Sequence, residues 1–141
     1  MPENAFRYVI VGSGNISRTY LKAIARSPGL ELVGTVSRSG RPIEDAPSEL
    51  PVFPSLDTVN VPFDAVILCT PNGLHHQGAS EAARLGKHVL TEKVLEISRK
   101  NMDAMIHDCE EAGVKLAVSY QRRMSPENQN LKRLLESGAL G

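Results

Sequence analysis

The feature that most constrains the fold is a short apolar run, Tyr8 to Val11, that stops at two glycines spaced by one residue. A helical pattern follows, so the order is strand, tight turn and helix. Gly12 permits the turn, Gly14 lets the backbone come close to a ligand, and the small Ser17 lets helix and strand pack together. Unpaired N–H groups and the positive end of the helix dipole then face phosphate charge. The pattern favours a site for the pyrophosphate of a dinucleotide, and the alternative is an ordinary glycine turn.

Strand-like and helix-like segments alternate along the chain, which is typical of a parallel sheet covered by helices. The expected strands are 8–11, 30–36, 64–69, 87–90 and 114–119, and the expected helices are 17–26, 74–85, 98–112 and 126–135. The stretch 37–54 looks irregular, with a short helix possible at 56–59. The predicted fold class is therefore α/β, a Rossmann-type doubly wound parallel sheet, with residues 1–141 forming a single domain of common size.

Composition argues against several classes of function. The chain has 16 basic and 16 acidic residues, so no net field attracts nucleic acid or a membrane surface, and neither partner is expected. Cys69 and Cys109 show no metal or disulfide spacing, and the adjacent His75 and His76 cannot point the same way, so no metal is expected. No run approaches the roughly 18 apolar residues of a membrane span. The first residues, 1–4, lack the features of a signal peptide, which predicts a cytoplasmic location.

The end of the second expected strand bears on the choice of cofactor. A site selective for NAD normally places Asp or Glu there, on the ribose 2′-hydroxyl. This chain has Ser37 and Arg38 and no acid. A serine hydroxyl and a guanidinium can both donate to a 2′-phosphate, which a carboxylate would repel. We therefore predict NADP rather than NAD; the alternative is a solvated loop that contains an arginine by chance.

Two more polar clusters follow expected strands, where ligands of parallel sheets bind. In the first, Thr70 to His76, a helix-entry loop capped by Asn72 is the alternative to a cofactor contact, and a histidine near a helix start commonly packs. In the second, Thr91 to Val94, a glutamate beside a lysine is usually a solvated pair. The same lysine, over a nicotinamide, can hold a substrate hydroxyl and lower its pKa. Composition alone does not choose between these readings.

Together these segments make the chain similar to the N-terminal domain of the Gfo/Idh/MocA family, the relatives of glucose-fructose oxidoreductase and inositol dehydrogenase. The resemblance covers essentially the whole chain. It rests on Gly12-Ser13-Gly14-Asn15-Ile16, Cys69-Thr70-Pro71-Asn72-Gly73-Leu74-His75, Gly86-Lys87-His88-Val89-Leu90-Thr91-Glu92-Lys93, and Arg123-Met124-Ser125-Pro126 running on to Gly138-Ala139-Leu140-Gly141.

The resemblance implies NAD(P)-dependent oxidation or reduction at a carbon–oxygen centre, commonly of a sugar, cyclitol or sugar-nucleotide. It makes Lys93 the catalytic residue, near the nicotinamide and the substrate hydroxyl, and places Glu92 close to the cofactor. His75 and Arg123 look like cofactor or substrate contacts. The expected cofactor-binding residues are Gly12, Ser13, Gly14, Asn15, Ile16, Ser37, Arg38, Cys69, Thr70, Pro71, Asn72, His75, Glu92, Lys93 and Arg123.

The chain departs from the family pattern at two points. Val94 stands where the motif has proline, so the backbone after Lys93 loses a fixed φ and gains an N–H. The sequence ends at Gly141, where family members continue into a second α/β domain that faces the substrate.

The leading hypothesis is the NADP-binding domain of such an oxidoreductase, which alone would bind cofactor and turn over poorly. A non-catalytic NADP-binding module is the alternative that Val94 favours. Another two-domain Rossmann reductase, of the homoserine dehydrogenase or dihydrodipicolinate reductase type, fits the Glu92-Lys93 element less well. The apolar side of the helix at 128–136 can drive self-association, which makes a homo-oligomer possible.

Overall fold

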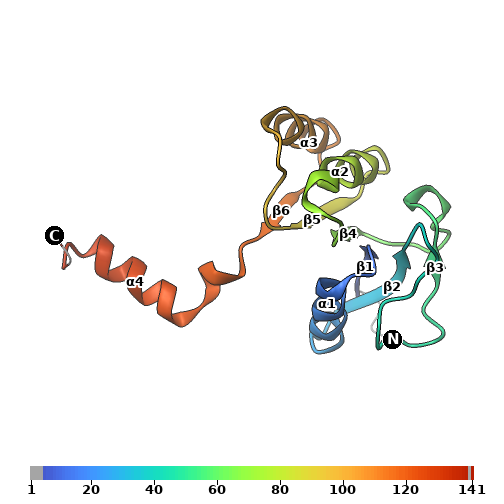
Figure 1. The fold of residues 1–141 in the computed structure, drawn as a ribbon, viewed down its shortest axis with the longest axis horizontal. Helices are drawn as coiled ribbons and strands as arrows, with labels where there is room; N and C mark the ends of the chain where they lie inside the picture. Colours follow the sequence, from blue (N-terminus) through green and yellow to red (C-terminus); the bar gives the residue numbers. More distant parts are fainter. Residues whose placement is uncertain (1–4, 140) are drawn as a thin grey trace.

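The computed structural model describes residues 5–139 and 141. Within them, six strands form one sheet in the order β3-β2-β1-β4-β5-β6, and every neighbouring pair is parallel (Figure 1). This is the strand order of a Rossmann sheet, which confirms the predicted fold class. The strands are β1 (Phe6–Val11), β2 (Leu30–Val36), β3 (Val52–Phe53), β4 (Ala65–Leu68), β5 (His88–Glu92) and β6 (Leu116–Ser119).

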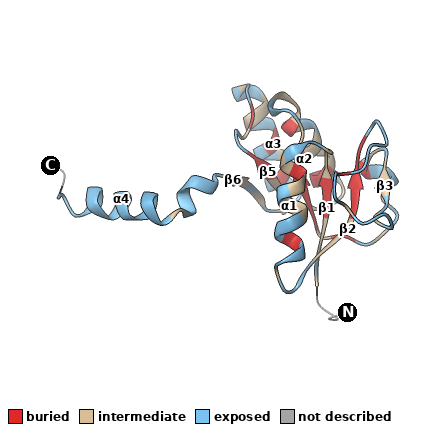
Figure 2. Cartoon of the chain, turned by 60° about the horizontal axis from the view of Figure 1, so that its bottom comes forward, coloured by how far each residue is buried: buried red, intermediate tan, exposed pale blue. Residues whose placement is uncertain are grey.

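Helices cover both faces of the sheet. They are α1 (Asn15–Ala25), α2 (His75–Arg84) and α3 (Arg99–Glu111). A further helix, α4 (Pro126–Glu136), lies apart from the sheet, and the short 3-10 turns are η1 (Leu56–Thr58), η2 (Asn72–Leu74) and η3 (Gln121–Met124). Successive strand residues point to opposite faces. Val9 and Val66 therefore pack in one core with buried residues of α2 and α3, while Ile10 and Ile67 pack in a second core with Ile24 of α1. Figure 2 shows this buried layer running through the central strands.

All the expected helices and strands are present, with ends that differ by a few residues. The stretch expected to be irregular contains β3, a two-residue strand held by hydrogen bonds from Thr35 N to Pro51 O and from Ser37 N to Phe53 O. Strand β5 runs two residues further than expected and ends on Glu92, and η3 was not expected at all. The missed elements β3, η2 and η3 are all too short for periodicity to reveal them. The short helix expected at 56–59 is present as η1.

Helix ends match the expected caps only in part. Gly86 and Gly113 follow α2 and α3 with φ of +67° and +65°, the left-handed conformation expected after a helix. Ser98 occupies the N-cap position of α3 but makes no capping hydrogen bond through its side chain. The N-cap residue of α2 is Leu74, and Asn72 instead starts the turn η2.

Helix α4 projects away from the sheet (Figure 1). Every residue from 126 to 139 is exposed, and Figure 2 shows this arm without a buried residue. The first turn is held locally, because the Ser125 hydroxyl accepts a hydrogen bond from Asn128 N. Among the residues that the structure describes, no helix is both long enough and apolar enough to cross a membrane.

Candidate functional site

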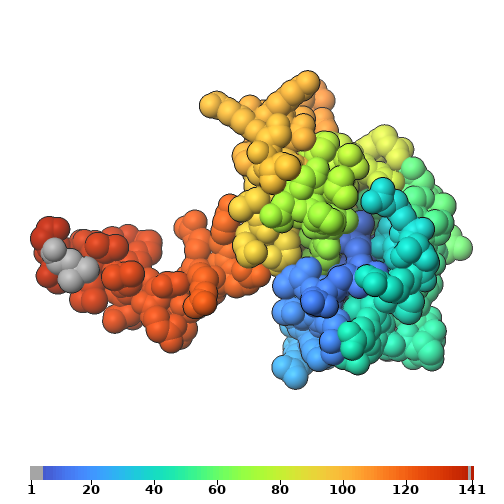
Figure 3. Space-filling view, in the orientation of Figure 1, coloured from blue at the N-terminus to red at the C-terminus, as the bar shows by residue number. Residues whose placement is uncertain are grey.

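A cleft of about 940 Å³ lies at the carboxyl ends of β1, β2 and β4. Between β1 and β4 the strand order reverses direction, the position where ligands of open α/β sheets bind. Figure 3 shows this face, with the blue glycine turn, the cyan segment after β2 and the green helix α2 around the hollow. The sequence-predicted residues that line the cleft are Gly12, Ser13, Gly14, Asn15, Ile16, Ser37, Arg38, Cys69, Thr70 and Pro71.

The glycine turn forms the floor of this cleft. Gly12 has φ of +109°, and a Cβ there would lie 2.8 Å from the backbone oxygen of Cys69. At Gly14, by contrast, a Cβ would meet no described atom within 4 Å. Gly14 is the N-cap of α1 and makes no side-chain cap, so the N–H groups of Asn15 and Ile16 are open to a ligand, whereas Ser17 N donates to Gly14 O at 3.1 Å. Ser17 is fully buried and donates to Gly12 O at 3.0 Å, which ties the helix to the turn.

Serines and arginines gather beside the turn, at the end of β2. The Ser37 hydroxyl lies 3.5 Å from that of Ser13 and 3.2 Å from that of Ser39. Arg41 donates from Nε to Ser13 Oγ and from Nη2 to Ser13 O, each at 3.4 Å. Arg38 also lines the cleft, on its exposed side. Sequence reasoning assigned no role to Arg41; the signal was a second arginine in the same acid-free loop.

The loop after β4 supplies the opposite wall. Burial raises the pKa of the Cys69 thiol to about 12, so this residue acts as a small apolar side chain and not as a nucleophile. Thr70 Oγ1 is buried at the cleft and has no hydrogen-bond partner among the described residues. An orphaned hydroxyl in a cleft suits a ligand that carries hydroxyl or amide groups.

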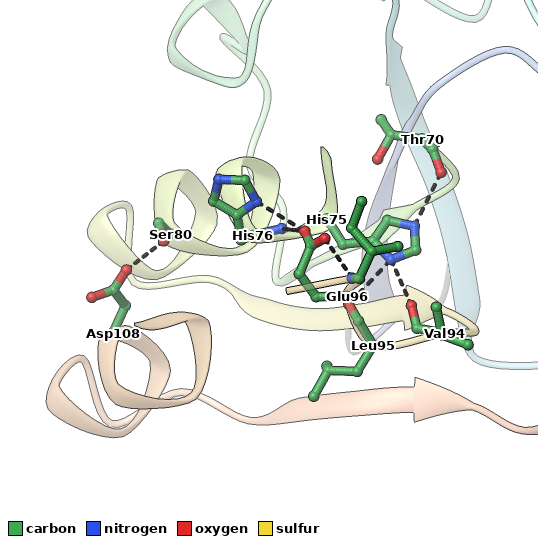
Figure 4. Close-up of polar contacts among 9 residues, drawn as sticks. Thr70, His75, His76, Ser80, Val94, Leu95, Glu96 and Asp108 are labelled. Atoms are coloured by element: carbon green, nitrogen blue, oxygen red, sulfur yellow. Dashed lines mark hydrogen bonds and ion pairs between the residues drawn. The ribbon is translucent and has the colours of Figure 1, made fainter. Parts of the chain in front are cut away.

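The two neighbouring histidines lie behind this wall (Figure 4). His75 is fully buried; its Nε2 is 3.0 Å from Thr70 O and its Nδ1 is 2.9 Å from Val94 O. The ring therefore lies between the loop after β4 and the segment after Lys93, and a neutral ring, which has one N–H, donates to one of these two sides at a time. It does not line the cleft, and neither does Asn72, which is exposed on η2.

Glu92 ends β5 with its carboxylate turned into the protein. Glu92 Oε1 accepts hydrogen bonds from the Tyr20 hydroxyl at 2.6 Å and from Gln121 Nε2 at 3.0 Å. Glu92 Oε2 accepts one from Lys93 N at 3.3 Å. Burial, together with the bond to Glu92, raises the pKa of Tyr20, so its hydroxyl remains a donor. Tyr20 and Gln121 thus fix this carboxylate, a role that sequence reasoning missed because three separate elements supply the residues.

Lys93 follows directly, with an exposed side chain. The Lys93–Val94 peptide bond is cis. Neither Glu92 nor Lys93 lines the cleft, and Arg123 stands exposed on η3. The structure therefore separates a cleft around the glycine turn from a rim that carries Glu92 and Lys93. In residues 5–139 and 141, no three His, Cys, Asp or Glu side chains gather in a way that could hold a metal ion.

The residues at the cleft fit a dinucleotide. The tight turn at Gly12, the open space beside Gly14 and the orphaned Thr70 hydroxyl suit a pyrophosphate and its riboses. Ser13 to Ile16 would hold the diphosphate and Ser37 would face the adenosine ribose.

Comparison with known proteins gives the same picture. A family model described as "Oxidoreductase family, NAD-binding Rossmann fold" matches residues 6–120. The uncharacterized oxidoreductase YrbE of Bacillus subtilis is 27% identical over 137 residues, which are 94% of this chain and 40% of YrbE. The 1,5-anhydro-D-fructose reductase of Ensifer adhaerens is 28% identical over 140 residues, 96% of this chain and 42% of that protein.

Among solved structures, the WlbA dehydrogenase from Bordetella pertussis, in complex with NADH and UDP-GlcNAcA, superposes with a TM-score of 0.87. It is 32% identical, and the match covers 95% of this chain and 42% of WlbA. The chain thus spans about two fifths of the length of the relatives it matches.

Proposed function

Because this chain belongs to the GFO_IDH_MocA family of oxidoreductases with the NAD-binding Rossmann fold, we propose that it is the NADP-binding part of a dehydrogenase or reductase. The parent enzyme transfers a hydride at a carbon–oxygen centre of a sugar, cyclitol or sugar-nucleotide-like substrate. The observation that carries the proposal is the cleft at the strand switch point, with the open helix N-terminus at Gly14 as its floor. The relatives support the substrate class. One relative is a reductase of an anhydro-sugar, and another binds a sugar-nucleotide.

In this mechanism NADP supplies the hydride acceptor or donor, and the chain positions the reacting groups. The backbone amides from Ser13 to Ile16 would hold the pyrophosphate, because the Gly12 amide already donates to Val36 O, and the helix dipole of α1 would favour the negative charge. Lys93, exposed on the rim, would hold the substrate hydroxyl through its ammonium and stabilise the charge that develops on that oxygen as a base removes the proton. Glu92 keeps the backbone of Lys93 in place through its bond to Lys93 N.

The preference for NADP rests on the acid-free end of β2. Ser37 and Arg38 line the cleft there, and Arg41 lies against Ser13 at its edge. Each of these side chains can donate a hydrogen bond to a phosphate on the ribose 2′-oxygen. None of them would accept a hydrogen bond from a free 2′-hydroxyl as strongly as the carboxylate of a site selective for NAD does. The WlbA complex contains NADH, so NAD is the alternative cofactor.

Calorimetric titration with NADP and with NAD tests this preference. We expect NADP to bind at least about tenfold more tightly, because a charge-assisted contact is worth roughly 1.5–3 kcal/mol. Arg38→Ala should weaken NADP binding about tenfold and leave NAD binding unchanged. Arg26→Ala, outside the cleft, should change neither. Equal or tighter binding of NAD by the unaltered protein would refute the assignment.

A second candidate, a module that binds NADP without catalysis, is favoured by Val94 in place of the motif's proline. An NADPH absorbance assay with a panel of keto-sugars separates the two in the parent protein. If the parent protein is an active oxidoreductase, Lys93→Met should lower its turnover at least about 100-fold with little change in cofactor affinity. A parent protein that binds NADP but consumes none of the panel supports the module.

A further inference from the structure

The segment that follows Lys93 is fastened to the first turn of α2 by two neighbouring histidines (Figure 4). His75 Nδ1 lies 2.9 Å from Val94 O and 3.2 Å from Leu95 O. One residue on, Glu96 Oε2 accepts hydrogen bonds from His76 N at 3.1 Å and from His76 Nδ1 at 2.9 Å. The main chain from 94 to 96 is therefore bound to α2 at successive positions.

Glu96 is unusual because its carboxylate is completely buried, with 0% of the side chain exposed. Burying a carboxylate without hydrogen-bond partners costs a large amount of free energy. The hydrogen-bond partners of Glu96 therefore explain why its burial is tolerated. Its other oxygen, Oε1, accepts from Ile97 N at 2.7 Å, so both oxygens are bound. Burial acts to raise the pKa of Glu96, but the hydrogen bonds from Ile97 and His76 outweigh it and hold that pKa below its usual range. The side chain is thus an anion at the N-terminal turn of α2, where the helix dipole favours it.

Lys93 lies between this anchor and a second one. On its other side, Lys93 N donates to Glu92, whose carboxylate Tyr20 and Gln121 hold. The main chain is thus fixed before and after Lys93, while the Lys93 side chain is exposed. Valine at position 94 provides no fixed φ there, so these hydrogen bonds are what orient the backbone from which the ammonium extends.

We propose that Glu96, acting through its bonds to His76, is a positioning residue that sets where the Lys93 ammonium stands. This inference rests on the proposed function in one respect, because that function is what gives Lys93 its catalytic role. The contacts of Glu96 do not depend on any cofactor. Neither the cleft nor the glycine turn touches Glu96, so its loss should act on Lys93 and leave cofactor affinity within about twofold.

The experiment follows the methyl ¹³C resonance of reductively methylated Lys93 in the cofactor-free chain, assigned with Lys93→Arg. Lys87 and Lys115 serve as internal references. Glu96→Ala should shift or broaden the Lys93 resonance alone, and amide exchange at Ile97 and His76 should become roughly tenfold faster or more. If Glu96→Ala does not fold, His76→Ala removes one donor from a ring that is already 26% exposed and should move Lys93 in the same direction.

Two comparisons separate positioning from a structural or a purely electrostatic effect. Asp108→Ala removes a different hydrogen bond to α2, the one that the Ser80 hydroxyl donates to Asp108. This bond lies on the side of α2 that faces α3. It should lower the melting temperature and leave the Lys93 resonance in place. Glu96→Gln removes the charge but keeps an oxygen facing His76, so it should move Lys93 less than Glu96→Ala does. An unmoved Lys93 resonance in folded Glu96→Ala, or equal shifts in the Gln and Ala variants, would overturn the proposal.

Because these readouts need no cofactor, failure of NADP binding would count against the proposed function and not against this assignment.

Discussion

Gly12 and Gly14 stand two residues apart, yet a methyl group would meet different surroundings at each. At Gly12 the backbone has positive φ and the new Cβ would lie 2.8 Å from Cys69 O. At Gly14 the Cβ would point into open space, where the pyrophosphate is expected to lie. The first glycine is thus required by the contacts of the protein itself, whereas the space beside the second is open to the ligand that we propose.

This difference predicts opposite outcomes for two alanine variants. Gly12→Ala should destabilise the protein by on the order of 2 kcal/mol, because strain and overlap add, and should abolish cofactor binding. Gly14→Ala should lower the melting temperature by a few degrees at most, because alanine is less favoured than glycine at an N-cap, and should weaken cofactor binding about tenfold or more. Thermal unfolding and calorimetric titration of both variants provide the check. A Gly14→Ala variant as destabilised as Gly12→Ala would show that the space beside Gly14 is not free.

At the same scale, sequence reasoning found the residues whose role depends on local pattern. The glycine turn and the acid-free end of β2 are read directly from spacing, and both line the cleft. It did not find Arg41, Tyr20 or Gln121. Tyr20 meets Glu92 across 72 positions of sequence, and no local pattern predicts such a contact.

A salt bridge between Arg7 and Asp64 joins the starts of strands β1 and β4, and the hydrophobic periodicity of the sequence does not reveal it. Asp64 Oδ2 accepts from Arg7 N at 2.8 Å and from Arg7 Nε at 3.2 Å, and Arg7 Nη2 reaches Asp64 Oδ1 at 3.1 Å. Hydrogen bonds from the Arg7 side chain and backbone hold the pKa of Asp64 below its usual range. The residue therefore prefers to be charged in the folded state.

The sign of the pH dependence follows from that lowered pKa. A carboxyl with a depressed folded-state pKa stabilises the fold above its unfolded pKa of about 3.9, and this stabilisation is lost as pH falls through the folded value. Asp64→Asn should therefore lower the melting temperature by a few degrees at pH 7, and the difference should shrink toward zero below about pH 4. Melting curves of both proteins from pH 7 to pH 3 measure it. A constant difference across this range would mean that the Asp64 charge is not responsible.

The longer elements could be predicted from the sequence, and most of the shortest could not. Strand β4 is buried at every position, as its continuous apolar run indicates, and α3 lies between Ser98 and Gly113, the residues expected at its ends. Strand β3 consists of two residues whose hydrogen bonds come from β2, so only the assembled sheet defines it. The extension of β5 to Glu92 likewise depends on pairing with β6, where Glu92 lies opposite Ser119.

For the molecule as a whole, the sheet and α4 are nearly independent. No residue of α4 is buried, and its main contacts are with the adjoining turn η3. Its apolar residues Leu131, Leu134 and Leu135 are exposed. We expect these side chains to promote self-association, which light scattering at increasing concentration would detect.

A shortened chain tests this independence. Removal of the residues after Met124 should change the melting temperature by less than about 2 °C and leave cofactor affinity unchanged, because the cut spares Gln121 and its bond to Glu92. It should also abolish the concentration-dependent self-association. A cut after Tyr120, which removes Gln121, serves as the comparison and should loosen the rim beside Lys93. Loss of the fold in the longer of the two chains would contradict the view that α4 is peripheral.

The bond between Gln121 and Glu92 also connects the turn η3 to strand β5. The chain leaves the sheet through β6 and reaches the outlying arm by way of η3, and on that route the Gln121 amide grips the carboxylate of Glu92. A movement of α4 about Ser125 would leave this bond intact, whereas a movement that carried η3 along would strain the bond between Gln121 Nε2 and Glu92 Oε1. This bond therefore links the segment that carries α4 to Glu92, the residue that precedes Lys93.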